Sequence, residues 1–325
     1  GLGFSRGWDE SIDRKKGRFV GAWGESEWKD AILQGPHLHV STPLYKSPNS
    51  TMKNNLDWSP TDFEALGSSA LPVTSYKPSG DRATYAASYG CWSDPGGLPV
   101  RNHFRVAWRA MAANTGERTL ITAIIPPGTA HINGVFCMGG SAVQSDTILG
   151  VAGVTSTLLS DFNVRAAPKS GIYQAVFERL PMVDLAHPLA PSLILRAARL
   201  NCLTDAYASL WAESWRSCFA QDKSILPSCD AQSIEAQWTP RTPLRRAVDR
   251  RNTLVELDAL VALMLGVDID DLCTVYRTQF AVLYGYDHNA YTFDLNGRLV
   301  PNSVLTVWRK KGDKLAGQTL DDDFF

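Results

Sequence analysis

The sequence lacks both a surplus of charge of one sign and any long hydrophobic run. Its 325 residues include 32 Lys and Arg against 33 Asp and Glu, which gives a formal net charge of −1. This balance provides no overall attraction to nucleic acid or to a membrane surface, so any anion site must come from a local patch. The longest apolar runs, such as residues 260–267, are far shorter than the ~20 residues of a membrane span. We therefore expect no membrane partner.

The six cysteines form no metal-binding or redox motif. None belongs to a C-x-x-C pair, and no histidine stands at zinc-ligand spacing from two of them. Thiols in apolar runs usually fill a core, which favours a reducing, cytoplasmic location. His37 and His39 would lie on one face of a strand as two ligands, but no third ligand is near them in the sequence. We therefore expect no metal site.

Catalytic motifs are also missing. The sequence contains no glycine-rich phosphate-binding loop and no G-x-S-x-G nucleophile motif. Its one Pro-Pro pair is Pro126-Pro127, flanked by Ile125 and Gly128. An amino-methyltransferase needs Asn or Asp before this pair and an aromatic residue after it, to hold a flipped base. We therefore expect no catalytic residue and no cofactor within this chain.

The chain is rich in apolar residues, 44% of the total, and its character changes along its length. Residues 1–35 are charged and predict a lead-in segment with at most one short helix. Residues 36–190 combine turn-rich loops with strand-like alternation, which is typical of a β-rich module. Residues 191–283 carry apolar residues at helical spacing, and residues 284–325 predict a hairpin at Asn296-Gly297 followed by a tail. The expected fold class is α+β, with a mixed β-sheet module followed by a helical module.

Periodicity predicts the individual elements. Alternating apolar residues predict strands over 103–109, 118–125 and 134–138, and a further short strand is expected over 40–45. Apolar residues at helical spacing predict helices over 145–161, 191–218 and 243–265. Asp268 is expected to cap one more helix, and Ser59, followed by Pro60, is expected to begin another.

Two basic patches stand out against the neutral total. In the first, Arg101, Arg105 and Arg109 fall on one face of the predicted strand, because side chains alternate with a period of two. Arginine binds phosphate and the guanine edge through paired hydrogen bonds, although the same side chains would also suit a solvated sheet face. The second patch spans residues 241–251. It could track a phosphate backbone, but we favour a solvated helix face or pairing with acids elsewhere in the chain.

Four segments carry a family resemblance. They are TPLYK at 42–46, FRVAWR at 104–109, ERTLITAIIPP at 117–127 and ILGVAGVTSTLLSDFNVR at 148–165. Their order resembles the target-recognition region of large adenine-specific DNA methyltransferases, namely the type IIG restriction–modification enzymes and the methylases of phage-defence systems such as BREX and DISARM. The resemblance covers most of the chain, residues 40–298. Its most specific part is Arg118-Thr119 with the apolar strand that follows.

This resemblance implies DNA sequence recognition by the specificity part of an N6-adenine DNA methyltransferase whose catalytic half is not in this chain. The intact enzyme would then be a site-specific adenine DNA methyltransferase that uses S-adenosylmethionine. The implied partners are double-stranded DNA, the catalytic methyltransferase domain and further defence-system subunits. The chain begins at Gly1 without a methionine, which agrees with a piece of a larger enzyme.

In a recognition module, the apolar strand at 121–125 would be a rigid mount for polar residues at its two ends. Arginine reads guanine and asparagine reads adenine by paired hydrogen bonds. For Arg118 itself we favour an ion pair with a buried carboxylate, because it belongs to the pattern that the family shares. Base-reading residues are expected in the loops at 46–101 and 131–133. The candidate DNA-binding residues are Lys46, Lys53, Asn54, Arg82, Arg101, Asn102, Arg105, Arg109, Arg118, His131 and Asn133.

Two other functions compete with this hypothesis. The helices at 191–280 could be an assembly platform in a defence complex, with no DNA affinity of their own and with the terminal Asp323-Phe324-Phe325 as a docking tag. Glu27 and Lys29 match half of a metal-dependent nuclease motif, with Asp9 or Asp13 as a second carboxylate for Mg²⁺. A solvated charge pair explains the same two residues.

Overall fold

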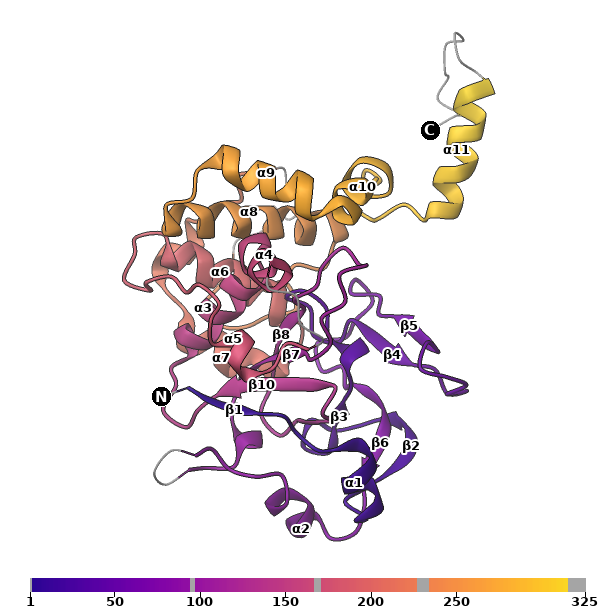
Figure 1. Cartoon of the computed structure of the whole chain (residues 1–325), viewed down its shortest axis with the longest axis vertical. Coiled ribbons are helices and arrows are strands. Elements are labelled where there is room, and N and C mark those ends of the chain that lie inside the picture. Colours follow the sequence, from indigo (N-terminus) through magenta and orange to yellow (C-terminus); the bar gives the residue numbers. More distant parts are fainter. Residues whose placement is uncertain (1, 94–96, 167–170, 227–233, 315–325) are drawn as a thin grey trace.

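The structure, a computed structural model, describes residues 2–93, 97–166, 171–226 and 234–314. It has the expected α+β fold, with strands gathered in the lower part of Figure 1 and most helices above them. The strands are β1 (Gly3–Ser5), β2 (Phe19–Glu25), β3 (Ile32–Leu33), β4 (Lys46–Pro48), β5 (Trp58–Pro60), β6 (Val73–Pro78), β7 (Arg105–Arg109), β8 (Thr122–Ile125), β9 (Ala130–His131) and β10 (Val135–Gly139). The α-helices are α1 (Glu10–Lys15), α2 (Arg82–Ala87), α3 (Ser145–Thr155), α4 (Leu158–Ala166), α5 (Gln174–Phe177), α6 (Ala190–Asn201), α7 (Ala208–Ser214), α8 (Ala247–Leu265), α9 (Ile269–Gln279), α10 (Ala281–Asn289) and α11 (Asn302–Lys314). Short 3₁₀ turns are η1 (Trp28–Asp30), η2 (Gly35–His37), η3 (Val100–Asn102), η4 (Asp205–Tyr207) and η5 (Ser217–Ala220).

A four-stranded antiparallel sheet in the order β1-β10-β7-β8 forms the centre of the molecule. Side chains alternate along β7, so that Val106 and Trp108 join the core cluster on one face and Ala107 joins the cluster on the other. The strands predicted over 103–109 and 134–138 are confirmed as β7 and β10. The strand predicted over 118–125 is shortened to β8.

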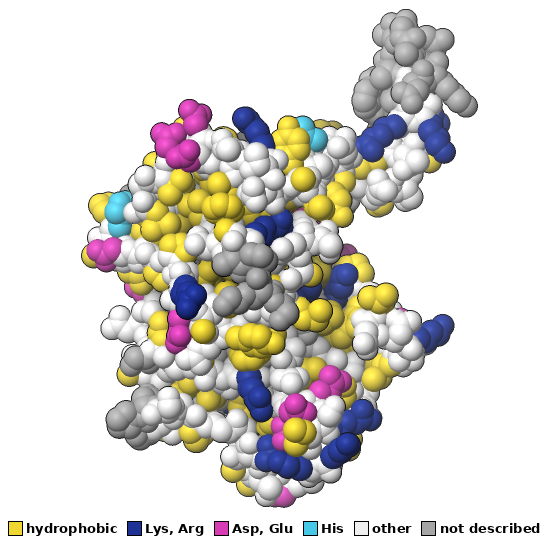
Figure 2. Space-filling view, in the orientation of Figure 1, with side chains coloured by type: hydrophobic (Ala, Val, Ile, Leu, Met, Phe, Trp, Pro, Cys, Tyr) yellow, Lys and Arg dark blue, Asp and Glu magenta, His cyan; other side chains and the backbone are white. Residues whose placement is uncertain are grey.

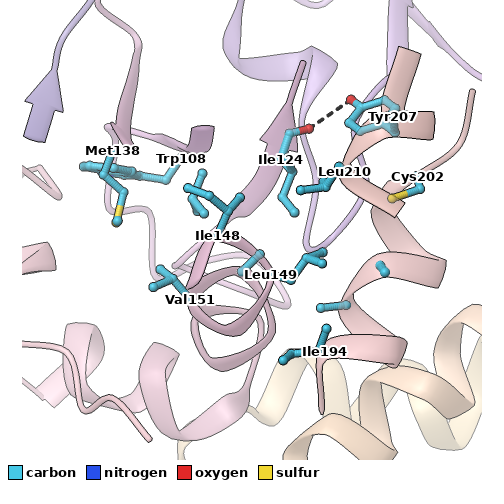
Figure 3. Close-up of a cluster of buried hydrophobic side chains, with 14 of the residues drawn as sticks. Trp108, Ile124, Met138, Ile148, Leu149, Val151, Ile194, Cys202, Tyr207 and Leu210 are labelled. Carbon is cyan, nitrogen blue, oxygen red and sulfur yellow. Dashed lines mark hydrogen bonds between the residues drawn. The ribbon is translucent and has the colours of Figure 1, made fainter. Parts of the chain in front are cut away.

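Helices α3 and α6 pack on the first face of this sheet and enclose its largest core cluster (Figure 3). Trp108 donates from Nε1 to the carbonyl oxygen of Ile172 at 2.7 Å, and the hydroxyl of Tyr207 donates to the carbonyl oxygen of Ile124 at 3.0 Å. Both large rings are thus buried with their polar atoms satisfied. Burial of each such side chain contributes on the order of 1.5–3 kcal/mol, and this layer therefore holds the sheet in place.

The N-terminal layer, residues 2–93, covers the opposite face of the sheet. Trp8, Phe19 and Ile32 are buried there beside Ala107 and Ile125. Strand β1 adds an edge to the sheet, and β2 pairs with β6 in a ribbon of its own. Residues 1–35 contain one short α-helix, α1, as expected, but they also form the strands β1, β2 and β3, which the sequence did not predict. Strands of two to seven residues between irregular loops are too short to give a clear periodic pattern.

The helix predicted over 145–161 is broken into α3 and α4, which meet at a bend of 63°. Thr155, Ser156 and Thr157 lie at the break, and their hydroxyls donate to carbonyl oxygens three or four residues back at 2.8, 2.6 and 2.8 Å. Such bonds compete with the backbone ladder and bend helices. Within the described residues no single helix is long and apolar enough to cross a membrane, although this bent pair passes that test by length and composition.

The remaining helices form the helical part, α6 to α11. Helix α6 packs against α8, and α8 to α10 lie together above the sheet, whereas α11 extends away from the body (Figure 1). Asp268 caps α9 as expected and accepts from the N–H of Asp270 at 2.8 Å. The hairpin turn predicted at Asn296-Gly297 is confirmed, since Gly297 has a φ of 77° and Phe293 pairs with Leu299. The tail expected after it is wrong in part, because residues 302–314 form helix α11.

Two predictions between residues 40 and 60 are wrong. Residues 40–45 form turns instead of a strand, with positive φ angles of 47° at Ser41 and 58° at Leu44. Ser59 and Pro60 belong to strand β5 and do not begin a helix. The N–H of Ser41 donates to the carbonyl oxygen of Thr122 at 2.7 Å, and both Ser41 and Leu44 are buried. Contacts with the sheet therefore fix this segment more strongly than its local pattern does.

Candidate nucleic-acid interface

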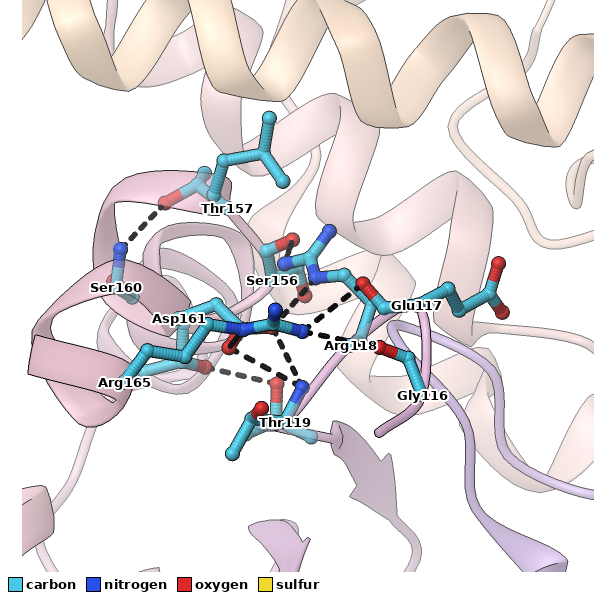
Figure 4. Close-up of polar contacts among 12 residues, drawn as sticks. Gly116, Glu117, Arg118, Thr119, Ser156, Thr157, Ser160, Asp161 and Arg165 are labelled. Atoms are coloured by element: carbon cyan, nitrogen blue, oxygen red, sulfur yellow. Dashed lines mark hydrogen bonds and ion pairs between the residues drawn. The ribbon is translucent and has the colours of Figure 1, made fainter. Parts of the chain in front are cut away.

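Arg118 lies inside the protein (Figure 4). Its Nε donates to Asp161 at 2.8 Å, and its Nη2 donates to the carbonyl oxygen of Ser156 at 2.6 Å. Asp161 also accepts from the N–H of Thr119 at 2.9 Å and from Arg165 at 3.2 Å. The interpretation of Arg118 as the partner of a buried carboxylate is confirmed. Its guanidinium is used inside the fold, and we remove it from the candidate DNA surface.

Arg101 and Arg105 are buried beneath the N-terminal layer. Arg105 is fully buried and donates to the carbonyl oxygens of His103 at 3.1 Å and Thr129 at 2.5 Å. Arg101 is buried and donates from Nε to the carbonyl oxygen of Gly128 at 2.9 Å. Neither guanidinium faces solvent, so both residues leave the candidate DNA surface.

Arg109 also binds backbone carbonyl groups of the protein. It donates to the carbonyl oxygens of Gly35 at 2.9 Å and of Leu38. The N-terminal layer crosses the sheet as irregular loops, and their buried carbonyl groups lack the partners of a regular ladder. A guanidinium offers five N–H donors and satisfies several carbonyl groups at once. The sequence pattern placed Arg105 and Arg109 on one face of a strand correctly, but that face is covered and not open to DNA.

The segment after the apolar strand also points inward. His131 is fully buried, and burial lowers its pKa to about 3. Asn133 is half-buried and donates to Asp9 at 3.3 Å. The N–H groups of Ala130 and Ile132 donate to the segment around β3 at 2.8 and 3.1 Å. The expectation of a base-reading loop at residues 131–133 is therefore wrong, because backbone pairing holds this segment in the core.

The other members of the candidate set have side chains at or near the surface. Arg82 is exposed at the start of α2, but it pairs with Asp30 at 2.6 Å. Asn102 is exposed at the end of η3. The structure brings the last three together on strands β4 and β5 and the loop between them: Lys46, Lys53 and Asn54.

Strands β4 and β5 form an antiparallel ribbon, residues 46–60, that pairs with no other strand in the described part of the chain. Its tip carries three exposed residues in a row, Lys53, Asn54 and Asn55. The Oδ1 of Asn54 accepts from the N–H of Leu56 at 2.8 Å. Asn55 was missing from the candidate set, although the run Lys53-Asn54-Asn55 was a signal that could have included it. The ribbon therefore presents amide groups and a cation together.

The carboxylate of Asp57 accepts hydrogen bonds from other residues at the tip of the ribbon. Asp57 is the one acidic residue among residues 46–60. It accepts from the hydroxyl of Thr51 at 2.5 Å, from the amide of Asn49 at 2.8 Å and from the N–H of Lys53 at 2.9 Å. These hydrogen bonds lower the pKa of Asp57 to about 2. Asp57 therefore shapes the tip, and the two lysines give the ribbon a net positive charge.

Contacts with the N-terminal layer anchor the base of the ribbon. The ring of Trp58 packs edge-on against the ring of His37, with centroids 4.8 Å apart. His37 donates from Nε2 to the carbonyl oxygen of Val73 at 2.9 Å, and burial lowers its pKa to about 4. Trp23 donates from Nε1 to the carbonyl oxygen of Pro48 at 2.8 Å. The ribbon therefore stands on a fixed base (Figure 1).

The basic patch at 241–251 is partly internal as well. Arg250 is buried and donates to the carbonyl oxygens of Ser41 at 3.1 Å and Leu200 at 3.0 Å. Arg245 donates to the carbonyl oxygen of Phe63 at 2.8 Å. These bonds tie the helical part to loops of the N-terminal layer. The interpretation as a solvated helix face is therefore wrong for Arg245 and Arg250.

The residues of the nuclease alternative do not converge on one point. Glu27 and Lys29 form an ion pair at 2.6 Å in which both side chains are mostly exposed. Asp9 caps α1, and Asp13 pairs with Arg18 at 2.8 Å. Among the described residues, no group of three or more His, Cys, Asp or Glu side chains is placed to hold a metal ion. The geometry gives the nuclease alternative no support.

On the face shown in Figure 2, basic and acidic side chains are interspersed and no broad basic field is visible. A nucleic-acid contact on this face is therefore expected to be local, such as the tip of the ribbon. No protein-family model matches the chain, and no curated protein gives a significant match. Function must accordingly be inferred from the residues and their geometry.

Proposed function

We propose that this chain is the specificity part of an N6-adenine DNA methyltransferase from a restriction–modification or phage-defence system, and that it recognises double-stranded DNA through the ribbon. The observation that carries the proposal is an anchored ribbon whose tip exposes Lys53, Asn54 and Asn55. A two-stranded ribbon fits the major groove of B-DNA. The resemblance of segments 42–46 and 117–127 to a target-recognition region gives independent support.

The polar ribbon residues have distinct roles in this proposal. Asn55 offers an amide donor and an amide acceptor, the pair of groups that binds the major-groove edge of adenine. Lys46 and Lys53 neutralise phosphates, which adds affinity and orientation but carries no sequence information. Two phosphate contacts from the ribbon are few. This agrees with a chain of net charge −1 that acts beside a separate catalytic domain.

The methyl transfer belongs outside this chain. S-adenosylmethionine and the target adenine would bind the catalytic domain, and the ribbon would determine which sequence is presented to that domain. We place the protein in the cytoplasm, where thiols such as those of the buried Cys137 and Cys202 stay reduced.

Titration of a fluorescent random-sequence duplex with the full chain, at salt concentrations between about 50 and 200 mM, tests the proposal. The ribbon variant Lys46→Ala/Lys53→Ala is compared with wild type and with Lys15→Ala/Lys16→Ala, which removes two exposed lysines at the end of α1. We expect the ribbon variant to bind roughly tenfold more weakly and to lower the salt slope by about 1.8, the value for two phosphates. The control variant should keep wild-type values.

No binding of wild type at the lowest salt concentration, or equal losses in the two double variants, would overturn the assignment of DNA to the ribbon. Selection of preferred duplexes from a random pool then tests sequence reading. Wild type should enrich one site. We expect Asn55→Ala to bind DNA but to relax the choice of base at one position, at a cost of about 1–3 kcal/mol in discrimination.

Helix α11 favours the assembly alternative, whose docking tag at residues 323–325 lies outside the described residues. It extends from the body (Figure 1) and exposes Val307 and Trp308 beside Arg309, Lys310 and Lys311. The partner in this alternative is the catalytic methyltransferase domain, docked on the exposed Trp308, and the chain alone would have no DNA affinity. Loss of co-purification with that domain in Trp308→Ala, together with no DNA binding by wild type, is the result this alternative requires.

A further inference from the structure

A cavity of about 580 Å³ lies where the N-terminal layer meets the helical part. Segments that flank the ribbon line one side, with Tyr45 immediately before β4 and Phe63 shortly after β5. The helical part lines the other side, with Arg250 in the first turn of α8 and with Tyr291 and Phe293 after α10. Ligand pockets typically measure about 300–1,000 Å³ and often lie at such junctions. The DNA contacts proposed for the ribbon make no use of this cavity.

Half-buried aromatic rings give the cavity flat apolar walls. They belong to Tyr45, Phe63, Tyr291 and Phe293. The guanidinium of Arg250 lies 5.0 Å from the ring centre of Phe63, and this contact holds that ring in place. Stacking on an aromatic side chain stabilises a bound base whatever its identity, because every base has a π-face. The walls therefore favour a planar aromatic ligand over a flexible aliphatic one.

The lining of the cavity includes the carboxylate of Glu117, which is held by two hydrogen bonds. His39 donates from Nε2 to Glu117 at 3.2 Å, and the hydroxyl of Tyr291 donates to the other carboxylate oxygen. Burial opposes the ionisation of Glu117, but the bonds from His39 and Tyr291 outweigh it and hold the pKa at about 2. Burial also lowers the pKa of His39 from its ordinary value, and the bond to Glu117 partly offsets this effect. The result is a fixed carboxylate, the group that accepts from an exocyclic amino group of a base.

Two arginine side chains lie at another place in the lining, around the start of α8. Arg245 and Arg250 donate to backbone carbonyl oxygens and a hydroxyl, and within the described residues neither pairs with a carboxylate. Burial lowers the pKa of Arg250 to about 9, so its guanidinium is still charged at neutral pH. Ala247 begins the 19-residue helix α8 here, and a helix N-terminus adds partial positive charge. This end of the cavity favours an anionic group.

We propose that this cavity binds a single nucleotide. Its base packs against Phe63 and Phe293, and an exocyclic amino group donates to Glu117. Its phosphate lies at the start of α8, beside Arg245 and Arg250. Adenine, cytosine and guanine carry an amino group and thymine does not, so the cavity discriminates against thymine.

The choice of a nucleotide over other planar anions rests on the proposed function, because the cavity lies at the base of the ribbon assigned to DNA. A nucleotide of this chemistry can come from two sources. One is a free mononucleotide. The other is a nucleotide swung out of a duplex that the ribbon holds, as base-flipping proteins do.

Calorimetric titration of the full chain with dAMP, dCMP and dTMP tests the inference. We expect wild type to bind dAMP and dCMP more tightly than dTMP. Phe293→Ala should weaken dAMP binding about tenfold through lost stacking, and Glu117→Gln should reduce the preference for dAMP over dTMP. The matched control is Tyr173→Ala, which removes an exposed ring far from this lining and should change neither quantity. Thermal unfolding establishes that each variant is folded.

The inference is overturned if wild type binds no nucleotide at millimolar concentration, if it binds dAMP and dTMP equally, or if folded Phe293→Ala binds dAMP like wild type. The source of the nucleotide is read from a duplex that contains 2-aminopurine. Fluorescence that rises on protein binding and falls when dAMP is added indicates a nucleotide swung out of DNA. Binding of dAMP without that rise indicates a free nucleotide.

Failure of the inference is separable from failure of the proposed function. Salt-sensitive DNA binding that depends on Lys46 and Lys53, without nucleotide binding, overturns the inference and leaves the proposed function standing. The opposite result is nucleotide binding that depends on Phe293 together with a ribbon variant that binds DNA like wild type. That result supports the nucleotide site and overturns the assignment of DNA to the ribbon.

Discussion

At the scale of single residues, arginine side chains take the place of missing backbone partners. Arg101, Arg105 and Arg109 donate to carbonyl oxygens of loops that cross the sheet. Arg245 and Arg250 do the same between the helical part and the N-terminal layer. Loops without a regular ladder leave buried carbonyl groups that need donors. Arginines interleaved with aromatic residues on a strand therefore indicate DNA binding only where the face of that strand is open.

Arg118→Ala tests the buried ion pair. The side chain of Arg118 is 5% exposed and that of Asp161 is 0% exposed, so the variant leaves a buried carboxylate without its main partner. We expect the free energy of unfolding to fall by about 3–5 kcal/mol, measured by urea denaturation. The matched control is Arg82→Ala, which breaks a pair whose arginine is 60% exposed and should cost less than about 1 kcal/mol. Equal losses would contradict the structural role of Arg118.

Arg105→Lys keeps the positive charge and tests the geometry of the donors. Lysine carries its three donors on one nitrogen and cannot reproduce the fork that serves His103 and Thr129. We expect a loss of about 1–3 kcal/mol in the free energy of unfolding, with the DNA affinity of the folded protein unchanged. A variant of wild-type stability with weakened DNA binding would return Arg105 to the DNA surface.

At the scale of elements, regular periodicity predicted those elements that are regular. Strand β7, helix α8 and the capped helix α9 follow from alternation, helical spacing and an acidic cap. Elements fixed by distant contacts were missed, among them the turn at Ser41 and the bend at Ser156. The ribbon belongs to this second group, because its three-residue strands include Pro48 and Pro60 and give no alternating pattern.

The tip of the ribbon is expected to respond to acid through Asp57. Hydrogen bonds from Thr51, Asn49 and Lys53 lower its pKa in the folded protein to about 2, below the value of about 3.9 in an unfolded chain. The stabilisation is therefore complete above about pH 4 and is lost as the pH falls toward about 2. In NMR spectra the amide of Lys53 should titrate with a midpoint near pH 2 in wild type, and this titration should be absent in Asp57→Asn. A wild-type midpoint near pH 4 would show that the carboxylate is not held by these bonds.

At the scale of the whole molecule, one sheet is buried between two unlike layers. The sequence predicted an α+β fold with a β-rich region before a helical one, which the structure has. It did not predict that residues 1–35 complete the core. Part of the candidate site could be predicted from the sequence. Lys53 and Asn54 belong to a polar segment between predicted elements, and this composition indicates an exposed loop. The burial of Arg105 could not be predicted, because it depends on which distant segment covers its strand face, and no local pattern contains that information.

The two proposed sites are neighbours in this architecture. The ribbon stands on the N-terminal layer, and the cavity lies at its base, where Arg245 and Arg250 join that layer to the helical part. DNA held by the ribbon would therefore lie close to the opening of the cavity. The buried arginines fix the loops on which both proposed sites stand. None of them belongs to the proposed DNA contacts of the ribbon, whereas Arg245 and Arg250 also lie beside the phosphate in the proposed nucleotide site.

Site-specific photo-cross-linking to duplex DNA tests the central claim most directly. A photoreactive amino acid replaces Asn54 at the tip of the ribbon, or Lys16 at the end of α1 as the control, in the full chain; both positions are exposed. We expect light-dependent cross-links to DNA from position 54, declining as salt is raised, and none from position 16. DNA that binds the chain and cross-links from position 16 but not from position 54 would contradict the assignment of the ribbon as the DNA-reading element.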